Sequence, residues 1–136
     1  MIKKLLNPGN PSSGISFGLL LLRVASAAMM LSHGIPKFQR LLDGNLRFGD
    51  PLGIGSDLSF ILVVFAEFVC SLALIAGFFS RLAVIPLAFA MLVAFGITHA
   101  DDPFGTQEKP MLYFAVFVVL AITGPGKYSL DKKLYG

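Results

Sequence analysis

Four long apolar runs, separated by short polar segments, dominate the chain. The runs cover residues of about 15–33, 58–79, 82–98 and 111–123. Each comes close to the length of roughly 20 residues that an α-helix needs to cross the hydrocarbon core of a bilayer. Since lipid offers no water to the backbone polar groups, such runs must be helical. The pattern therefore predicts four membrane-spanning helices.

The segments between the runs predict how these helices are connected. Gly34 and Pro36 follow the first run and are typical helix-stop signals, and Ser80 and Arg81 form a tight turn between the second and third runs. Helices joined by such short connections pack antiparallel. We therefore expect an all-α fold, a transmembrane four-helix bundle of the up-down-up-down type, with residues 1–136 forming one integral membrane domain.

Composition narrows the class of protein further. Hydrophobic residues make up 55% of the chain and charged residues only 14%, against about 25% charged residues in ordinary soluble domains. The net charge of +3 comes from residues at the ends of the apolar runs, where lipid head groups explain them and nucleic acid does not. A single cysteine, Cys70, excludes an internal disulfide and a zinc site made of thiolates.

The flanking charges predict an orientation, because cytoplasmic loops of membrane proteins are enriched in Lys and Arg. One side of the predicted bundle carries Lys3, Lys4, Arg81, Lys127, Lys132 and Lys133. The other side carries Lys37, Arg40, Arg47 and Lys109, together with Asp43, Asp50, Asp57, Asp101, Asp102 and Glu108. We therefore expect both termini and the turn at residues 80–81 to lie in the cytoplasm.

Two ionisable residues interrupt the apolar runs, Arg23 in the first and Glu67 in the second. A charge at the bilayer centre costs at least about 2.5 kcal/mol, so each needs a partner or a function. Counted along the helices, the two lie at depths that a long arginine side chain can bridge. The pair then either locks the two helices together or marks a polar cavity between them.

Helical spacing extends this polar feature along the first run. Arg23, Ser26 and His33 fall on one stripe of the helix, and Glu67 begins a similar stripe on the second run. His33 and His99 both reach the outer interface, next to Lys37. We predict that Arg23, Ser26, His33, Lys37, Glu67 and His99 line a ligand-binding cavity that opens toward the outer face; no metal site and no catalytic residue is assigned.

The histidines leave three interpretations open. They are amphipathic residues at head-group depth with no special role, or groups that exchange protons and hydrogen bonds with a small ligand near neutral pH. Ligation of haem or of a metal is a weaker third interpretation, because nothing in the sequence supplies the outer hydrogen bonds that orient such ligands.

Three stretches resemble the DoxX family of small bacterial four-helix membrane proteins. They are LLLLRVASAAMMLSHGIPKF, FAEFVCSLALIAGFFSRLAVIPLAFAM and KPMLYFAVFVVLAITGPGKYSLD, and the likeness runs from Leu19 to Asp131. The resemblance implies an integral protein of the bacterial inner membrane. It also implies that Arg23, His33, Gly34, Lys37, Glu67, Arg81 and His99 occupy the characteristic positions of the family.

The resemblance further implies a link to membrane oxidoreductase complexes, to oxidative-stress defence and to quinone-reducing sulfur metabolism. The first functional hypothesis is therefore a quinone-facing membrane subunit of an oxidoreductase, with quinone as a bound ligand, no covalent cofactor and a partner subunit that supplies electrons. It would not be an enzyme by itself. The alternative is a non-catalytic scaffold or assembly subunit in a larger complex. Small-solute transport is a third hypothesis and would require a homo-oligomer.

Overall fold

A computed structural model describes all of residues 1–136, and every regular element in it is helical. The elements are α1 (Ile2–Leu6), α2 (Ser13–Leu42), α3 (Ser56–Val64), η1 (Phe65–Cys70), α4 (Ser71–Ala76), α5 (Ser80–Val93), η2 (Ala94–Thr98), α6 (Phe104–Thr123) and α7 (Leu130–Tyr135). The segments η1 and η2 are π-helical. Since no residue interrupts the helical backbone between them and their neighbours, α3, η1 and α4 form one continuous helix, and α5 and η2 form another. The all-α prediction is confirmed.

The first long helix corrects the sequence prediction. Gly34 and Pro36 do not end it; α2 continues to Leu42. Gly34 lies inside the helix because α2 packs against the η1 backbone there: a Cβ on Gly34 would lie 2.4 Å from the carbonyl oxygen of Glu67. The glycine allows close packing between helices, but in the sequence a glycine in this position looks the same as one that ends a helix.

The other boundaries lie closer to the prediction. The second run ends at Ala76, where Gly77 takes the left-handed conformation with φ of 72° that glycine adopts without strain. The fourth helix begins at Phe104, several residues before the predicted start, and includes Pro110. Its first turns are therefore polar and its apolar part is short.

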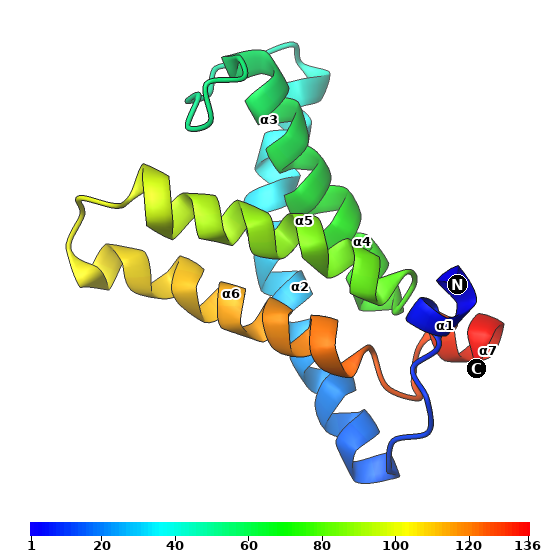
Figure 1. The fold of residues 1–136 in the computed structure, drawn as a ribbon. Helices are drawn as coiled ribbons and strands as arrows, with labels where there is room; N and C mark the ends of the chain where they lie inside the picture. Colours follow the sequence, from blue (N-terminus) through cyan, green and yellow to red (C-terminus); the bar gives the residue numbers. More distant parts are fainter.

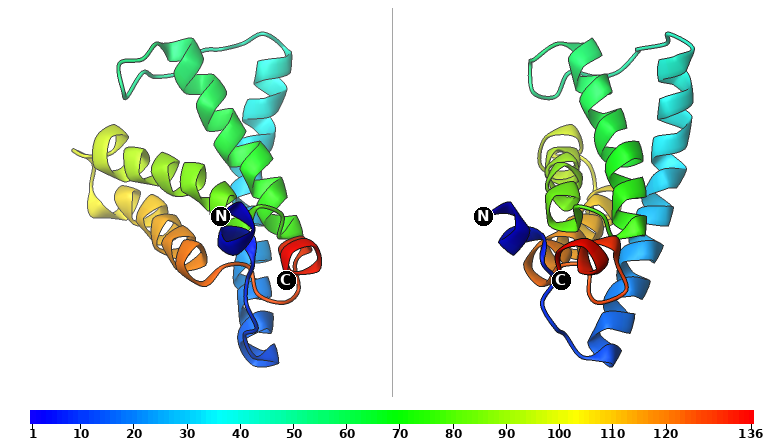
Figure 2. Two further views of the ribbon diagram at one scale, coloured as in Figure 1. Left: turned by 45° about the vertical axis from the view of Figure 1, so that its right-hand side comes forward. Right: turned by 90° about the vertical axis from the view of Figure 1, so that its right-hand side faces the viewer.

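The long helices form two antiparallel hairpins that cross each other. Figures 1 and 2 show α2 beside the continuous helix α3–η1–α4, while the α5–α6 hairpin crosses α2 at a steep angle. The two hairpins meet at the turn between α4 and α5 and splay apart at their other ends (Figure 1). The short helices α1 and α7 lie together at the end where the hairpins meet.

Three helical segments are long and apolar enough to cross a membrane: Ser13–Leu42, Ser56–Ala76 and Ser80–Thr98. Many large apolar side chains point outward from them, including Ile15, Leu21 and Phe89, which are 60%, 61% and 52% exposed. Such surfaces are unfavourable in water and suited to lipid. The core lies where the hairpins cross, and it consists of buried apolar side chains such as Met30, Leu74, Leu87 and Phe117.

Candidate functional site

Arg23 is fully buried, and its guanidinium binds the C-terminal segment of the chain. Its Nη1 donates a hydrogen bond of 2.6 Å to the carbonyl oxygen of Pro125, and its Nη2 donates one of 2.8 Å to the carbonyl oxygen of Tyr128. Only 1% of the residue is exposed. Hydrogen bonds from a charged donor are the stronger kind, so Arg23 fixes the segment after α6 against α2.

Asp131 completes this arrangement from the other side. Its carboxylate accepts hydrogen bonds from the backbone amides of Phe79 (2.7 Å) and Ser80 (2.8 Å) at the start of α5. These amides have no partner inside the helix, and a carboxylate at a helix N-terminus satisfies them. We refer to Arg23, Asp131 and the backbone of residues 125–128 as the tail clasp.

Glu67 has a different partner from the one that the sequence predicts. Its Oε2 accepts a hydrogen bond of 2.7 Å from the Nζ of Lys37, and the two form an ion pair. The predicted pairing of Glu67 with Arg23 is therefore wrong, since Arg23 is held by the tail clasp. The Glu67 side chain is 8% exposed and that of Lys37 is 23% exposed.

The register of α2 against the continuous helix α3–η1–α4 explains the error. Gly34 lies directly against the backbone of Glu67. Arg23 lies eleven residues earlier in α2, about 16 Å along the axis at 1.5 Å per residue, and is level with Gly77: a Cβ there would lie 3.2 Å from the guanidinium carbon of Arg23. Arg23 and Glu67 are thus about three helical turns apart.

A cavity of about 430 Å³ lies between the helix α3–η1, the helix α5–η2 and the loop of residues 43–55. Its wall is mainly apolar, with Leu62, Phe65, Phe89 and Met91 among its lining residues. Lys37, Glu67 and His99 provide its ionisable groups. A largely apolar cavity with a few polar groups is the usual composition of a small-molecule site.

Both π-helical segments border this cavity. Phe65, Ala66 and Glu67 of η1 and Ala94 and Thr98 of η2 are lining residues, and His99 follows η2 directly. π-helical turns are rare and occur frequently at functional sites. Their occurrence on both walls of one cavity makes this the candidate site.

The six predicted cavity residues are divided by the structure. Lys37, Glu67 and His99 line the cavity. His33 is outside the lining, partly exposed, and experiences the charges of Lys37, Glu67 and Lys109. Ser26 donates to the carbonyl oxygen of Leu22 in its own helix, and Arg23 belongs to the tail clasp. Whether any of these residues binds a ligand stays a prediction.

His99 is tied to the turn between α5 and α6. Its Nδ1 lies 2.6 Å from Oδ2 of Asp102, and its carbonyl oxygen accepts a hydrogen bond from Gln107 at 2.6 Å. These contacts orient the ring at the outer edge of the cavity. No three His, Cys, Asp or Glu side chains gather closely enough to hold a metal ion.

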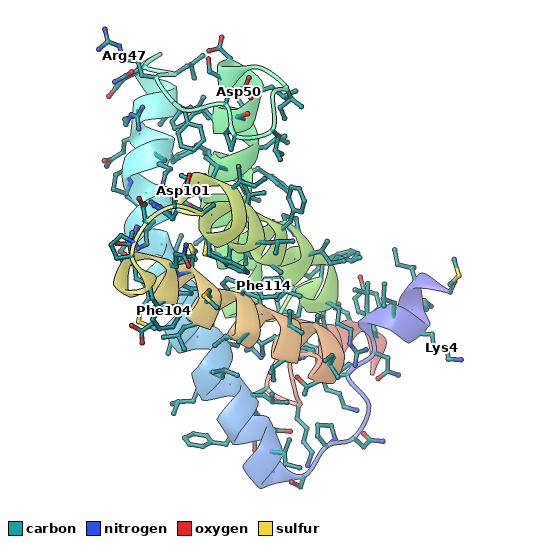
Figure 3. All side chains as sticks on the ribbon, turned by 60° about the vertical axis from the view of Figure 1, so that its left-hand side comes forward. Lys4, Arg47, Asp50, Asp101, Phe104 and Phe114 are labelled. Carbon is teal, nitrogen blue, oxygen red and sulfur yellow. The ribbon has the colours of Figure 1, made fainter.

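The loop of residues 43–55 covers the end of the cavity between α2 and α3. Phe48 packs on Phe60 with ring centroids 5.5 Å apart, so this loop packs against the helices. Asp50 accepts hydrogen bonds from the amides of Ile54 and Gly55, each at 3.0 Å, and from the Ser59 hydroxyl at 3.1 Å. Figure 3 shows Asp50 beside the first turn of α3.

These hydrogen bonds also set the charge of Asp50. Desolvation raises the pKa of the carboxyl, but the bonds from Gly55, Ser59 and Ile54 outweigh it and hold the pKa below its usual value. The carboxylate therefore stays ionised, and the loop stays fastened, to a lower pH than an unbound aspartate would allow. Sequence reasoning missed Asp50 and Asp131. An aspartate shortly before a helical run is a signal that could have indicated Asp50, but Asp131 caps a helix that begins 51 residues earlier in the chain, and no local signal indicates that contact.

The crossed helices, their apolar outer surfaces and a cavity walled by two of them define a multi-pass helical membrane protein with a largely apolar internal cavity. The chain belongs to the DoxX family, whose model matches residues 18–100. The sequence is 32% identical to "Inner membrane protein YphA" of Escherichia coli over 85% of this chain and 89% of that protein. It is 30% identical to "Inner membrane protein YqjF" of Escherichia coli, over 86% of this chain and 92% of that protein.

A more distant relative carries a functional name. The chain is 26% identical to "Putative oxidoreductase CatD" of Bacillus subtilis, over 88% of this chain and 89% of that protein. No solved structure matches the chain. The family, these relatives and the apolar helices together identify a multi-pass inner membrane protein.

Proposed function

We propose that this protein is the quinone-facing membrane component of an oxidoreductase complex. The observation that carries the proposal is the cavity between the two helices that contain π-helical turns, which combines an apolar wall with Lys37, Glu67 and His99. A quinone requires the same combination: polar groups for its carbonyl oxygens and an apolar space for its tail. The name of the Bacillus subtilis relative supports the redox class.

Each ionisable group has a role in this proposal. The ammonium of Lys37 donates a hydrogen bond to one quinone carbonyl, and the carboxylate of Glu67 beside it accepts one of the two protons that quinol releases when it is oxidised. The imidazole of His99 faces the second oxygen from the edge of the cavity and accepts the other proton, while the two electrons pass to the partner subunit. When the ligand binds, the Lys37–Glu67 ion pair separates, and each of the two charged groups then contacts the ligand.

Electrons must come from or go to a partner subunit. The single cysteine cannot hold an iron–sulfur cluster, which needs several thiolates, and the chain has no segment that resembles a nucleotide-binding βαβ unit. The protein is therefore proposed as one subunit of a complex, without catalytic activity alone.

The first test is the amount of quinone that copurifies with the protein in mild detergent. Changing Glu67 to Gln removes the charge that holds Lys37 in place and the proton acceptor, so bound quinone should fall about tenfold, as expected for the loss of one charge-assisted hydrogen bond. Extraction and chromatography of the lipids measure it. The matched control is Glu108→Gln on α6, which is exposed and outside the cavity and should retain the wild-type amount.

A scaffold without a ligand is the second candidate, and the closed ion pair favours it. Lys37 and Glu67 already satisfy each other at 2.7 Å, which is also the arrangement of a structural contact between α2 and η1. If quinone never copurifies, and Glu67→Gln changes only thermal stability, the scaffold is correct and the quinone proposal is not.

We also propose that α6 spans the membrane as a fourth segment, so that the long helices alternate in direction and both termini lie in the cytoplasm. The end of the molecule with α1 and α7 carries Lys3, Lys4, Arg81, Lys127, Lys132 and Lys133, as the positive-inside rule requires. A C-terminal green fluorescent protein fusion should therefore fluoresce, and a C-terminal alkaline phosphatase fusion should be inactive. The reverse result would place the C-terminus outside and would contradict the proposal.

A further inference from the structure

The rim of the cavity is made of apolar side chains that are about half exposed. Leu62 and Phe65 lie on the wall formed by α3 and η1, and Phe89 lies on α5; their exposed fractions are 49%, 47% and 52%. Exposed aromatic and aliphatic side chains around an opening are costly in water, at roughly 25 cal/mol per Å². The composition of the rim therefore suits contact with lipid.

The depth of this rim agrees with its composition. Phe65 is nine residues from the start of the helical segment Ser56–Ala76, and Phe89 is nine residues from the start of Ser80–Thr98. At 1.5 Å per residue, each lies about 14 Å from the end of its segment. Since the hydrocarbon core is about 30 Å thick, the opening lies near the middle of the bilayer.

The end of the cavity toward the loop between α2 and α3 is covered. Phe48, Leu52 and Ile54 of that loop are lining residues. Asp50 closes the loop through the amides of Ile54 and Gly55 and holds it to α3 through the hydroxyl of Ser59. Phe48 is further held by its contact with Phe60. Access from the aqueous phase at this end would require the loop to detach.

We infer that the cavity is entered sideways from the bilayer, through an opening between Leu62 and Phe65 on one side and Phe89 on the other. The ligand is an amphipathic molecule dissolved in lipid. Its polar head reaches the Lys37–Glu67 ion pair, and its apolar tail leaves through the opening into the hydrocarbon. The inference rests on the proposed function for the identity of the head group and adds the route by which that ligand arrives.

The test uses nitroxide spin labels on the full-length protein in phospholipid vesicles. Cys70 is replaced by Ala, and single cysteines are placed at Leu62, at Phe89 and, as the water-exposed control, at Arg47. Molecular oxygen concentrates in lipid, whereas the nickel complex Ni-EDDA stays in water. Labels at Leu62 and Phe89 should collide frequently with oxygen and at least about fivefold less frequently with Ni-EDDA than the label at Arg47.

Collision with Ni-EDDA at Leu62 and Phe89 as frequent as at Arg47 would overturn the inference, because the opening would then contact water. If the Phe89 variant does not fold, Val93, which also lines the cavity one turn further along α5, replaces it. These measurements need no quinone. A protein that binds no quinone would contradict the proposed function alone, and the labels would still show whether the opening faces lipid or water.

Discussion

Replacing Arg23 with methionine is expected to lower the free energy of unfolding in detergent by about 3 to 5 kcal/mol, the range for removing one member of a buried charged network. Methionine fills a similar volume but donates no hydrogen bond. The carbonyl oxygens of Pro125 and Tyr128 lose their charged donor, and the buried carboxylate of Asp131 loses the nearby positive charge. Thermal unfolding, or titration with a denaturing detergent, measures the loss.

The matched control is Arg81→Met. Arg81 also donates to backbone carbonyl oxygens, those of Leu5 and Asn7, but these hydrogen bonds are exposed to solvent. Water replaces them at little cost, so this variant should lose less than about 1 kcal/mol. Equal losses in the two variants would contradict the assignment of Arg23 to a buried clasp.

Replacing Gly34 with alanine is expected to be the second most damaging change, at about 1 to 3 kcal/mol or more. The new Cβ would lie 2.4 Å from the carbonyl oxygen of Glu67 and 2.9 Å from the amide nitrogen of Phe68. Both are backbone atoms, which cannot turn aside as a side chain can. The helices α2 and η1 must therefore separate, and the Lys37–Glu67 ion pair between them is stretched.

Gly18→Ala is the control for this prediction. Gly18 lies in the same helix, with nothing within 4 Å of the position of its Cβ, so alanine should leave stability unchanged or raise it slightly through helix propensity. The melting temperature and the amount of copurified quinone are measured for both variants. If Gly34→Ala is as stable as Gly18→Ala, the close contact between α2 and η1 does not exist.

The helices themselves were predictable because their signal is local. Runs of apolar residues identify segments that avoid water whatever they pack against, and three of the predicted four qualify as membrane-spanning helices in the structure. The ends were harder to place. Gly34 is a residue type that is typical of helix ends. Its role, however, is to let α2 approach the backbone of Glu67, which is more than thirty residues away in the chain.

The candidate site was predictable in part, because the position of a residue along its own helix is also a local property. Counting along helices gives a residue's height within its own helix, and this was enough to select Lys37, Glu67 and His99, which line one cavity. It assigned Arg23 the wrong partner because counting does not fix how far two helices slide past each other. A slide of two or three turns, at 5.4 Å each, replaces one partner by another.

The sequence by itself therefore determined the class of protein: a helical membrane protein with unexplained charges in its apolar runs. Hydrophobicity decides this residue by residue, so no neighbour needs to be known. Only the tertiary structure decided what those charges do. The contacts of Gly34 with Glu67 and of Gly77 with Arg23 fix the register of the helices. In that register Glu67 forms an ion pair with Lys37 beside the cavity, and Arg23 donates hydrogen bonds to the backbone of the C-terminal segment.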